Sequence, residues 1–332
     1  MRAAVRRSMN LAYLITAHKN PGQLVRLVER LNCDGTSFFV HVDKGTDEAT
    51  YRHMVDGLKP RPDVHFLTKR FQCHYMTLFS AVQAVVRGID ELLLSGTPFD
   101  YVIYLTGQDY PIKTNRQIKT ALKNAKGRSF LSYLPLPFEG THPAGGRIIQ
   151  NASRIECWHA HLFGHYLRLP LRGSSRFCRA ANLMLPKQRR FPRGFQPYGG
   201  WAYWCLARQH VLYVHHFVKA HPSFVRFFRF VKSADEICFQ TILLNSLFKN
   251  RMINDDLRYV DWSTEDCHPK LLRQDDLGPL ISSPKLFARK FDSQVDATIL
   301  DLIDEHILKT QVRKPGAASA TVADRLPAYT SA

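Results

Sequence analysis

The sequence contains no long apolar run. Its N-terminus, MRAAVRRSMNLAYLITAHKN, is basic, and the apolar stretch within it is only about eight residues, too short for a membrane span or for the apolar core of a signal peptide with its cleavage site. We therefore expect a cytoplasmic protein without a signal peptide or a transmembrane helix, whose contact with membranes is peripheral.

Cysteine patterns that bind metals or form disulfide frameworks are also missing. The chain has seven cysteines, an odd number, and none of them stands in a Cys-x-x-Cys or Cys/His ligand spacing. Buried free thiols in a reducing compartment explain this pattern better than a zinc site or a set of disulfides.

Several motifs that identify enzyme classes are absent. There is no GxGxxG or GxxxxGK[ST] loop, which weakens a dinucleotide- or ATP-binding interpretation, and no GxSxG, the commonest signal of a serine hydrolase. No DxD pair closes a predicted strand, since Asp43 and Asp109 each stand alone. A divalent ion that bridges phosphates usually binds one or two carboxylates, so a metal site is not favoured, and we expect no metal and no other cofactor.

Acidic residues are scarce relative to basic ones. Lys and Arg number 46 against 28 Asp and Glu, a net charge of +18, and the exceptions to their even spread are Arg2–Arg7 and Lys187–Arg193. Such a balance favours anionic partners: nucleic acid, an anionic membrane face or a phosphorylated substrate. Because no nucleic-acid-binding motif accompanies the charge, we expect no nucleic-acid partner.

The N-terminal third alternates predicted strands and helices. Strands are expected at Leu11–Thr16, Ser37–Val42 and Tyr101–Thr106, with amphipathic helices between them, the second over Leu78–Leu94. This order predicts βαβ units, hence an α/β fold with a mostly parallel, Rossmann-like central sheet flanked by helices. Ligands bind beyond the carboxyl ends of such strands, which is where His18, Asp43 and Asp109 fall.

The later chain is predicted to complete one large domain over residues 1–308. Residues of about 10–125 would form a nucleotide-binding half and about 126–308 an acceptor and catalytic half. From 309 to 332 the sequence turns to Pro, Ala, Ser and Thr, which predicts a disordered tail.

Lys232–Ser246 (KSADEICFQTILLNS) reads as a helix with Ser233 as N-cap and Glu236 at the capping-box position. Two interpretations of Glu236 stay open at this point: a helix cap, or a carboxylate held rigidly at the mouth of a cleft. Asp109 begins a tight turn in GQDYP, which favours a structural role, an Asx-type turn or a buried hydrogen bond near a ligand site.

Eight segments between about Asn10 and Leu308 carry a family resemblance: YLITAHKNP, FFVHVDKG, YLTGQDYPIKTN, YGGWAYWCL, SADEICFQTILLNS, RYVDW, HPK and KLFARKFD. In this order they resemble the core-2/I-branching β-1,6-N-acetylglucosaminyltransferases and the peptide O-xylosyltransferases, glycosyltransferase family 14, in a bacterial-type form. The resemblance implies a GT-A-like fold and an inverting, metal-independent glycosyltransferase that uses a UDP-sugar. His74-Tyr75-Met76 departs from the Trp-Gly-containing segment expected of bacterial relatives.

The resemblance also implies roles for particular residues. Glu236 matches the catalytic base, and Trp262 an aromatic wall of the acceptor site, to which we add Trp201. The remaining matches bind the donor: Ile15, Thr16, Ala17 and Asp43 around the nucleoside, Lys270 and Lys290 at the diphosphate. Lysines can neutralise a departing diphosphate as point charges where no metal does so.

The implied reaction moves GlcNAc from UDP-GlcNAc to a hydroxyl of a glycan, a lipid-linked saccharide or a protein. Two alternatives remain open: a UDP-xylose-dependent transferase, and a non-catalytic homologue that binds carbohydrate or nucleotide. The donor sugar, the acceptor and the linkage do not follow from these residues.

Overall fold

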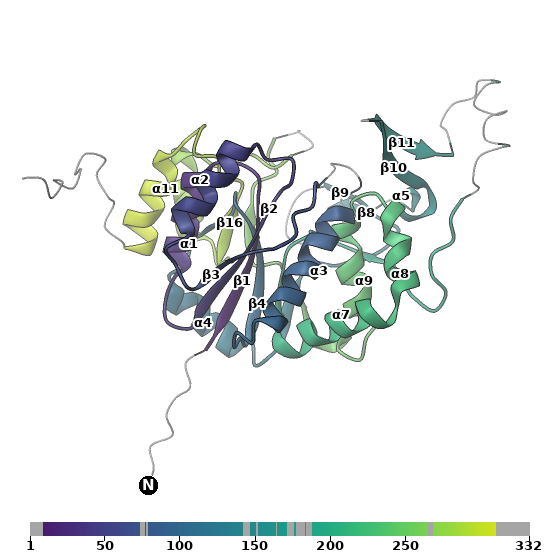
Figure 1. Cartoon of the computed structure of the whole chain (residues 1–332), viewed down its shortest axis with the longest axis horizontal. Helices are drawn as coiled ribbons and strands as arrows, with labels where there is room; N and C mark the ends of the chain where they lie inside the picture. Colours follow the sequence, from purple (N-terminus) through teal and green to yellow (C-terminus); the bar gives the residue numbers. More distant parts are fainter. Residues whose placement is uncertain are drawn as a thin grey trace, which may run out of the picture.

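The computed structural model describes residues 9–73, 77, 79–141, 147–150, 152–163, 165–170, 176, 183, 188–264 and 268–309 (Figure 1). Residues 310–332 of the expected disordered tail, and the departing segment His74-Tyr75-Met76, lie outside them. No helix among the described residues is both long and apolar enough to cross a membrane. The five cysteines in these ranges are free thiols, of which Cys157, Cys205 and Cys238 are buried and Cys33 and Cys73 are half-buried.

A seven-stranded sheet with the order β14-β6-β13-β4-β1-β2-β3 forms the centre of the molecule. β1 runs parallel to β2 and β4, and β2 parallel to β3, whereas β13 is antiparallel to both of its neighbours. The predicted α/β class with a mostly parallel sheet is therefore confirmed. The strands are β1 (Leu11–Ala17), β2 (Thr36–Val42), β3 (Val64–Phe66), β4 (Tyr101–Thr106), β6 (Ser129–Leu131), β13 (Trp204–Ala207) and β14 (Met252–Asn254).

Helices cover both faces of this sheet (Figure 1). The longer ones are α1 (Pro21–Leu31), α2 (Glu48–Leu58), α3 (Phe79–Leu94), α4 (Asn115–Asn124) and α7 (Arg208–Ala220). The shorter helices and helical turns are α5 (Ser153–Glu156), α8 (Pro222–Phe227), η1 (Phe228–Phe230), η2 (Ala234–Glu236), α9 (Cys238–Leu244), η3 (Lys249–Arg251), η4 (Gln274–Asp276), α10 (Leu277–Ser282), α11 (Thr298–Leu302) and the π-helical η5 (Ile303–Leu308).

Smaller sheets surround the carboxyl end of the central sheet. In the most consequential one, β16 (Phe287–Arg289) pairs with β15 (Arg258–Val260) and, antiparallel, with β5 (Tyr110–Pro111), which follows β4 directly. This pairing brings a C-terminal strand to the end of β4. The other pairs are β7 (Leu134–Pro135) with β12 (Tyr198–Gly199), β8 (Phe138–Thr141) with β9 (Arg147–Gln150), and β10 (Trp158–Leu162) with β11 (His165–Leu169).

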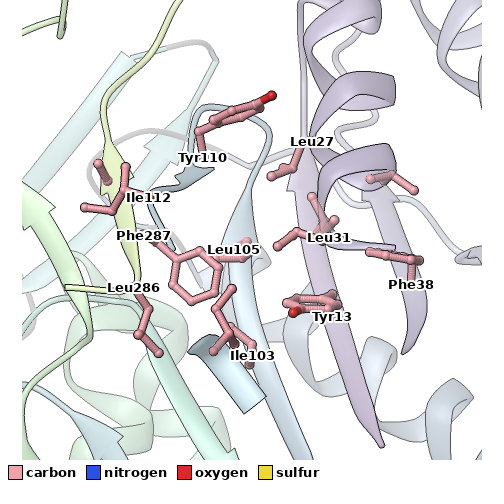
Figure 2. Packing of buried hydrophobic residues seen from close by; sticks show 14 of the residues in the cluster. Tyr13, Leu27, Leu31, Phe38, Ile103, Leu105, Tyr110, Ile112, Leu286 and Phe287 are labelled. Carbon is pink, nitrogen blue, oxygen red and sulfur yellow. The ribbon is translucent and has the colours of Figure 1, made fainter. Parts of the chain in front are cut away.

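Alternation along β1 explains why the sheet has a core on each face. Leu11, Tyr13 and Ile15 belong to a cluster that includes α1, whereas Ala12 and Leu14 belong to a second cluster that includes α3. Successive side chains of a strand point to opposite faces, so a strand buried on both sides reads as a continuous apolar run. Figure 2 shows the first cluster, in which Tyr13 stacks on Phe38 with ring centroids 5.3 Å apart.

The predicted helix over Lys232–Ser246 is wrong at its start. Ser233 has left-handed dihedrals (φ 49°, ψ 59°), and within the described chain its side chain makes no capping hydrogen bond. Residues Ala234–Glu236 form a separate 3-10 turn, and α9 begins only at Cys238. The cause is a tertiary contact: the Glu236 carbonyl accepts a hydrogen bond from the backbone N–H of Gly200 (2.9 Å).

Gly200 can make this approach because it has no side chain. A Cβ atom at this position would lie 2.0 Å from the carbonyl oxygen of Ser132. Tyr198–Gly199 and Trp204–Ala207 form two separate short strands on either side of Gly200 to Tyr203.

A fully buried carboxylate, Asp304, is among the groups that fix the C-terminal segment to the N-terminal half. Asp304 accepts hydrogen bonds from Arg26 Nη2 (2.7 Å), Arg30 Nε (2.7 Å) and the Tyr110 hydroxyl (2.8 Å). The Asp304 side chain is fully buried, whereas that of Asp301, which also pairs with Arg26, is 45% exposed.

We expect Asp304→Ala to lower the free energy of unfolding by about 3–5 kcal/mol, because it leaves two partly buried guanidinium groups without their shared anion. Asp301→Ala, the matched control, should cost less than about 1 kcal/mol because that pair is exposed to water. Urea denaturation of both variants measures this. Similar losses in the two variants would contradict the anchoring role of Asp304.

Candidate active site

Two adjoining clefts lie at the carboxyl end of the central sheet. The first cleft, of about 570 Å³, is lined by Thr16, Ala17, Asp43 and Lys290, among others. The second cleft, of about 430 Å³, is lined by residues including Trp201, Lys232, Glu236 and Trp262. Both clefts share Ala202, Tyr203, Asp235, His268 and Arg289, so a molecule in one would be separated from a molecule in the other by a single layer of side chains.

The ends of parallel strands form the wall of the first cleft. The register sets Ala17 of β1 beside Val42 of β2, so the residues that follow, His18 and Asp43, reach the same edge. The Asp43 carboxylate is fixed there by the backbone N–H groups of Gly45 (2.7 Å) and Cys73 (2.8 Å). Burial lowers the pKa of His18.

Asp109 lies beneath this cleft rather than in it. It is fully buried, and its Oδ2 accepts hydrogen bonds from the backbone N–H (2.5 Å) and the hydroxyl (3.1 Å) of Thr106. Its Oδ1 faces Arg289 Nη1 at 3.7 Å and Arg258 Nε at 3.9 Å. This geometry supports the structural role expected for the turn after β4.

Arg289 is a residue that sequence reasoning missed. Its guanidinium lies 4.2 Å from the ring centroid of Tyr203 and lines both clefts. Burial lowers its pKa, against the opposing effect of the Asp109 charge. The available signal was its place beside Lys290 in KLFARKFD, where two cations follow an apolar strand.

The two lysines expected at the diphosphate have different surroundings. Lys290 lines the first cleft, and burial together with the neighbouring Arg289 and Lys19 lowers its pKa. Lys270 donates to Asp276 (2.6 Å) and lies 3.8 Å from Asp261, and among the described residues it is not one that lines either cleft.

The structure also separates the three expected residues of β1. Thr16 and Ala17 line the first cleft. Ile15 is instead fully buried in the core, where its side chain belongs to the cluster around α1.

Glu236 faces the second cleft from the 3-10 turn η2. Its Oε2 accepts a hydrogen bond from Arg154 Nη2 at 2.7 Å, and the same Arg154 nitrogen donates to the carbonyl oxygen of Ser233 at 3.1 Å. The arginine therefore ties the side chain of Glu236 to the backbone of its own turn. Arg154 comes from α5, within a segment of weak periodicity, and no sequence pattern indicates this contact.

Asp235, which lies between the two clefts, is a buried carboxyl group beside this ion pair. Burial raises its pKa to about 8, and the negative charge of Glu236 acts in the same direction. The turn thus places Glu236 next to a carboxyl group, Asp235, whose raised pKa favours its protonated form.

Aromatic rings close the second cleft. Trp201 and Trp262 stack with ring centroids 4.9 Å apart and an interplanar angle of 14°. The structure thereby brings together the two tryptophans assigned to the acceptor site and sets them in the same cleft as Glu236. Among the described residues, no group of three or more His, Cys, Asp and Glu side chains is arranged to hold a metal ion.

The sequence matches a known family. Residues 11–140 and 158–287 match the family described as "Branch: Core-2/I-Branching enzyme", and both clefts are built almost entirely from these two stretches. The chain belongs to the core-2/I-branching enzyme family. This membership agrees with the expected GT-A-like α/β fold and with the central sheet described above.

Curated proteins similar to this chain are named as enzymes that transfer sugars. Human xylosyltransferase 2 is 24% identical over 322 residues, which cover 90% of this chain and 34% of that protein. Human N-acetyllactosaminide β-1,6-N-acetylglucosaminyl-transferase is 28% identical over 299 residues, 85% of this chain and 68% of that protein. The Arabidopsis thaliana β-glucuronosyltransferase GlcAT14B is 26% identical over 314 residues, 90% of this chain and 66% of that protein. The chain spans about a third of the length of the xylosyltransferases that it matches.

Similarity to solved structures is weak. The 4-diphosphocytidyl-2C-methyl-D-erythritol synthase of Anaerococcus prevotii aligns with a TM-score of 0.31 and 8% identity, over 65% of this chain and 76% of that chain. A glucose-1-phosphate thymidylyltransferase from Bacillus anthracis, so named provisionally, aligns with a TM-score of 0.29 and 9% identity, over 61% and 74% of the two chains.

The raised pKa of Asp235 predicts a pH-dependent stability. The unfolded chain releases this proton near the ordinary value of 3.8, whereas the folded chain keeps it up to about pH 8. Rising pH between these values therefore favours the unfolded state. We expect the free energy of unfolding of the wild type to fall with pH across this window relative to that of Asp235→Asn.

Urea denaturation at a series of pH values measures the difference. Asp275→Asn, an exposed carboxylate on η4, is the matched control and should keep the slope of the wild type. A wild-type slope equal to that of Asp235→Asn would show that Asp235 is ionised in the folded protein.

Proposed function

We propose that this protein is an inverting glycosyltransferase that moves a sugar from a UDP-sugar to a hydroxyl group of an acceptor. The observation that carries the proposal is the pairing of chemistry across two adjoining clefts. A carboxylate, Glu236, faces the second cleft, two cations, Arg289 and Lys290, face the first, and Arg289 lies on the shared wall. A base and an anion-binding group on opposite sides of one layer of side chains suit a transfer between two substrates.

In the proposed reaction Glu236 acts as the general base. The carboxylate takes the proton of the acceptor hydroxyl as the acceptor oxygen forms a bond to the anomeric carbon. The bond from that carbon to the diphosphate oxygen breaks on the opposite face, and its electron pair leaves with UDP. Such a base contributes about 10²- to 10⁴-fold to the rate. The hydrogen bond from Arg154 holds the carboxylate of Glu236 in place, so its position does not require a helix cap.

Negative charge develops on the departing diphosphate, and the first cleft supplies cations for it. Lys290 and Arg289 are adjacent in sequence and both line that cleft, so we propose that they take the role otherwise filled by a divalent ion. Lys270 can share this role only by exchanging Asp276 for the diphosphate. The nucleoside would lie at the ends of β1 and β2, against Thr16, Ala17 and Asp43.

For the donor we propose UDP-GlcNAc, with UDP-xylose as the alternative. The named β-1,6-N-acetylglucosaminyl-transferase supports the first, because this chain covers 68% of its length, and the named xylosyltransferases support the second. The proposed acceptor is a glycan, a lipid-linked saccharide or a protein that presents its hydroxyl between Trp201 and Glu236, with peripheral contact to an anionic membrane. Release of UDP from the two donors, measured side by side, separates the alternatives.

Glu236→Gln tests the proposed base. We expect turnover to fall by about 10²- to 10⁴-fold while UDP-sugar binding stays within about twofold of the wild type, because the amide keeps the shape of the side chain but accepts no proton. Coupled detection of released UDP and calorimetric titration of the donor measure the two quantities.

Glu156→Gln is a matched control for this variant. It lies on α5 two residues from Arg154 and bonds to Gln188 rather than to either cleft. Full turnover by Glu236→Gln would refute its assignment as the base, and a wild type that binds UDP without releasing it from any donor would favour the non-catalytic homologue.

A further inference from the structure

Positive charge is concentrated in one part of the sequence. Between Cys157 and Ala234 there are thirteen Lys and Arg and no Asp or Glu. This segment alone accounts for thirteen of the eighteen net positive charges of the chain. This concentration of one charge sign exceeds the basic balance of the rest of the chain, so the positions of these lysines and arginines in the fold matter.

Contacts between aromatic rings join two parts of this segment, residues 188–193 and residues 222–230. Phe191 packs edge-on against Phe227 at 5.2 Å and against Phe228 at 6.3 Å. The neighbouring Arg189 stacks on Phe227 at 3.8 Å and donates to the Phe230 carbonyl oxygen at 3.0 Å. The stretch around residues 188–193 therefore lies against α8 and η1.

Four exposed arginines surround these contacts: Arg190, Arg193, Arg226 and Arg229. Phe224 and Phe228 are buried one helical turn apart, so Arg226 and Arg229, which are also one turn apart, point away from the core. We call the four arginines the basic face.

The β10–β11 hairpin contacts the elements that carry the basic face through its first residue. Trp158, the first residue of β10, packs on Phe230 with ring centroids 5.2 Å apart. In Figure 1 the β10–β11 hairpin stands beyond α5 at the upper right. Phe163 lies in its tight connection and is 98% exposed, and Leu183 in the same acid-free segment is 88% exposed.

We propose that the basic face and the tip of the β10–β11 hairpin form a membrane-docking surface for anionic lipid. Clustered arginines are attracted to the negative surface potential of anionic lipid, and the exposed Phe163 ring on the hairpin gains by entering the headgroup region. A soluble polyanion would be attracted to the arginines but would leave Phe163 in water. The combination of charge and exposed aromatic ring therefore favours a membrane.

Short stretches of chain connect the docking surface to the second cleft. α5, which directly precedes β10, supplies the Arg154 that holds Glu236, and Lys232, which follows η1, lines the cleft itself. Docking through the hairpin would thus bring the mouth of the acceptor site to a lipid surface, which suits an acceptor carried by a lipid. This inference rests on the proposed transfer activity for its biological meaning, but lipid binding itself requires no sugar donor.

Vesicle sedimentation tests the proposal with the full chain and without any nucleotide sugar. We expect binding to vesicles of phosphatidylcholine mixed with phosphatidylglycerol, weakening as salt rises, and little binding to phosphatidylcholine alone. The double variant Arg226→Glu/Arg229→Glu should bind the anionic vesicles about tenfold or more weakly. Phe163→Asp should also bind more weakly although all four arginines remain.

The matched control reverses two exposed charges on α4, Arg116→Glu/Lys123→Glu, which changes the net charge equally. It should stay within about threefold of the wild type, since these residues lie elsewhere on the surface. Should the reversed α8 variant fail to fold by thermal denaturation, Arg190→Gln/Arg193→Gln in the adjoining loop replaces it.

Three results would overturn the proposal: equal binding to neutral and anionic vesicles, equal losses in the α4 variant and in Arg226→Glu/Arg229→Glu, or heparin binding with wild-type vesicle affinity in Phe163→Asp. The last result would assign the arginines to a soluble polyanion. Release of UDP in the presence of a soluble acceptor, measured on the same variants, tests the transfer activity separately.

Discussion

The buried carboxylate of Asp109 positions the turn after β4 and the arginine side chains beside both clefts. It fixes the turn after β4 through Thr106, and its other oxygen faces the guanidinium groups of Arg258 and Arg289. Both arginines also lie against the ring of Tyr203, at 4.6 and 4.2 Å. Two cations packed against one ring would repel each other without an anion beneath them. Asp109 therefore sets the position of the one arginine that lines both clefts.

Much of the fold follows from local patterns. The strand Tyr101–Thr106 has the bounds that its apolar pattern indicates, and β1 and β2 differ from expectation by one residue. Each of these elements buries the face on which its own sequence places apolar residues. The segment Lys232–Ser246 behaves differently, because the hydrogen bond from Gly200 to the Glu236 carbonyl competes with the helical one, and no local pattern contains that partner.

The same distinction separates the site residues. Asp43 and His18 could be placed from the rule that ligands lie at strand ends, and Glu236, Lys290 and Trp262 from the family resemblance. Arg154 could not, because its partner Glu236 is 82 residues away in the sequence and no local pattern encodes that contact. Arg289 was hidden for a similar reason, since its counter-ion comes from the turn after β4. Lys270 is the opposite case. Its position matches the family, but its ammonium group donates a hydrogen bond to Asp276.

We propose that cations of the first cleft, rather than a divalent metal ion, hold the diphosphate of the donor. Calorimetric titration of UDP in the presence of EDTA tests this proposal. We expect UDP to bind under these conditions with an affinity that added Mg²⁺ or Mn²⁺ does not increase. Lys290→Ala should weaken binding by about tenfold or more, while Lys123→Ala on α4 should leave it unchanged. UDP binding that requires added metal, or wild-type affinity in Lys290→Ala, would refute the proposal.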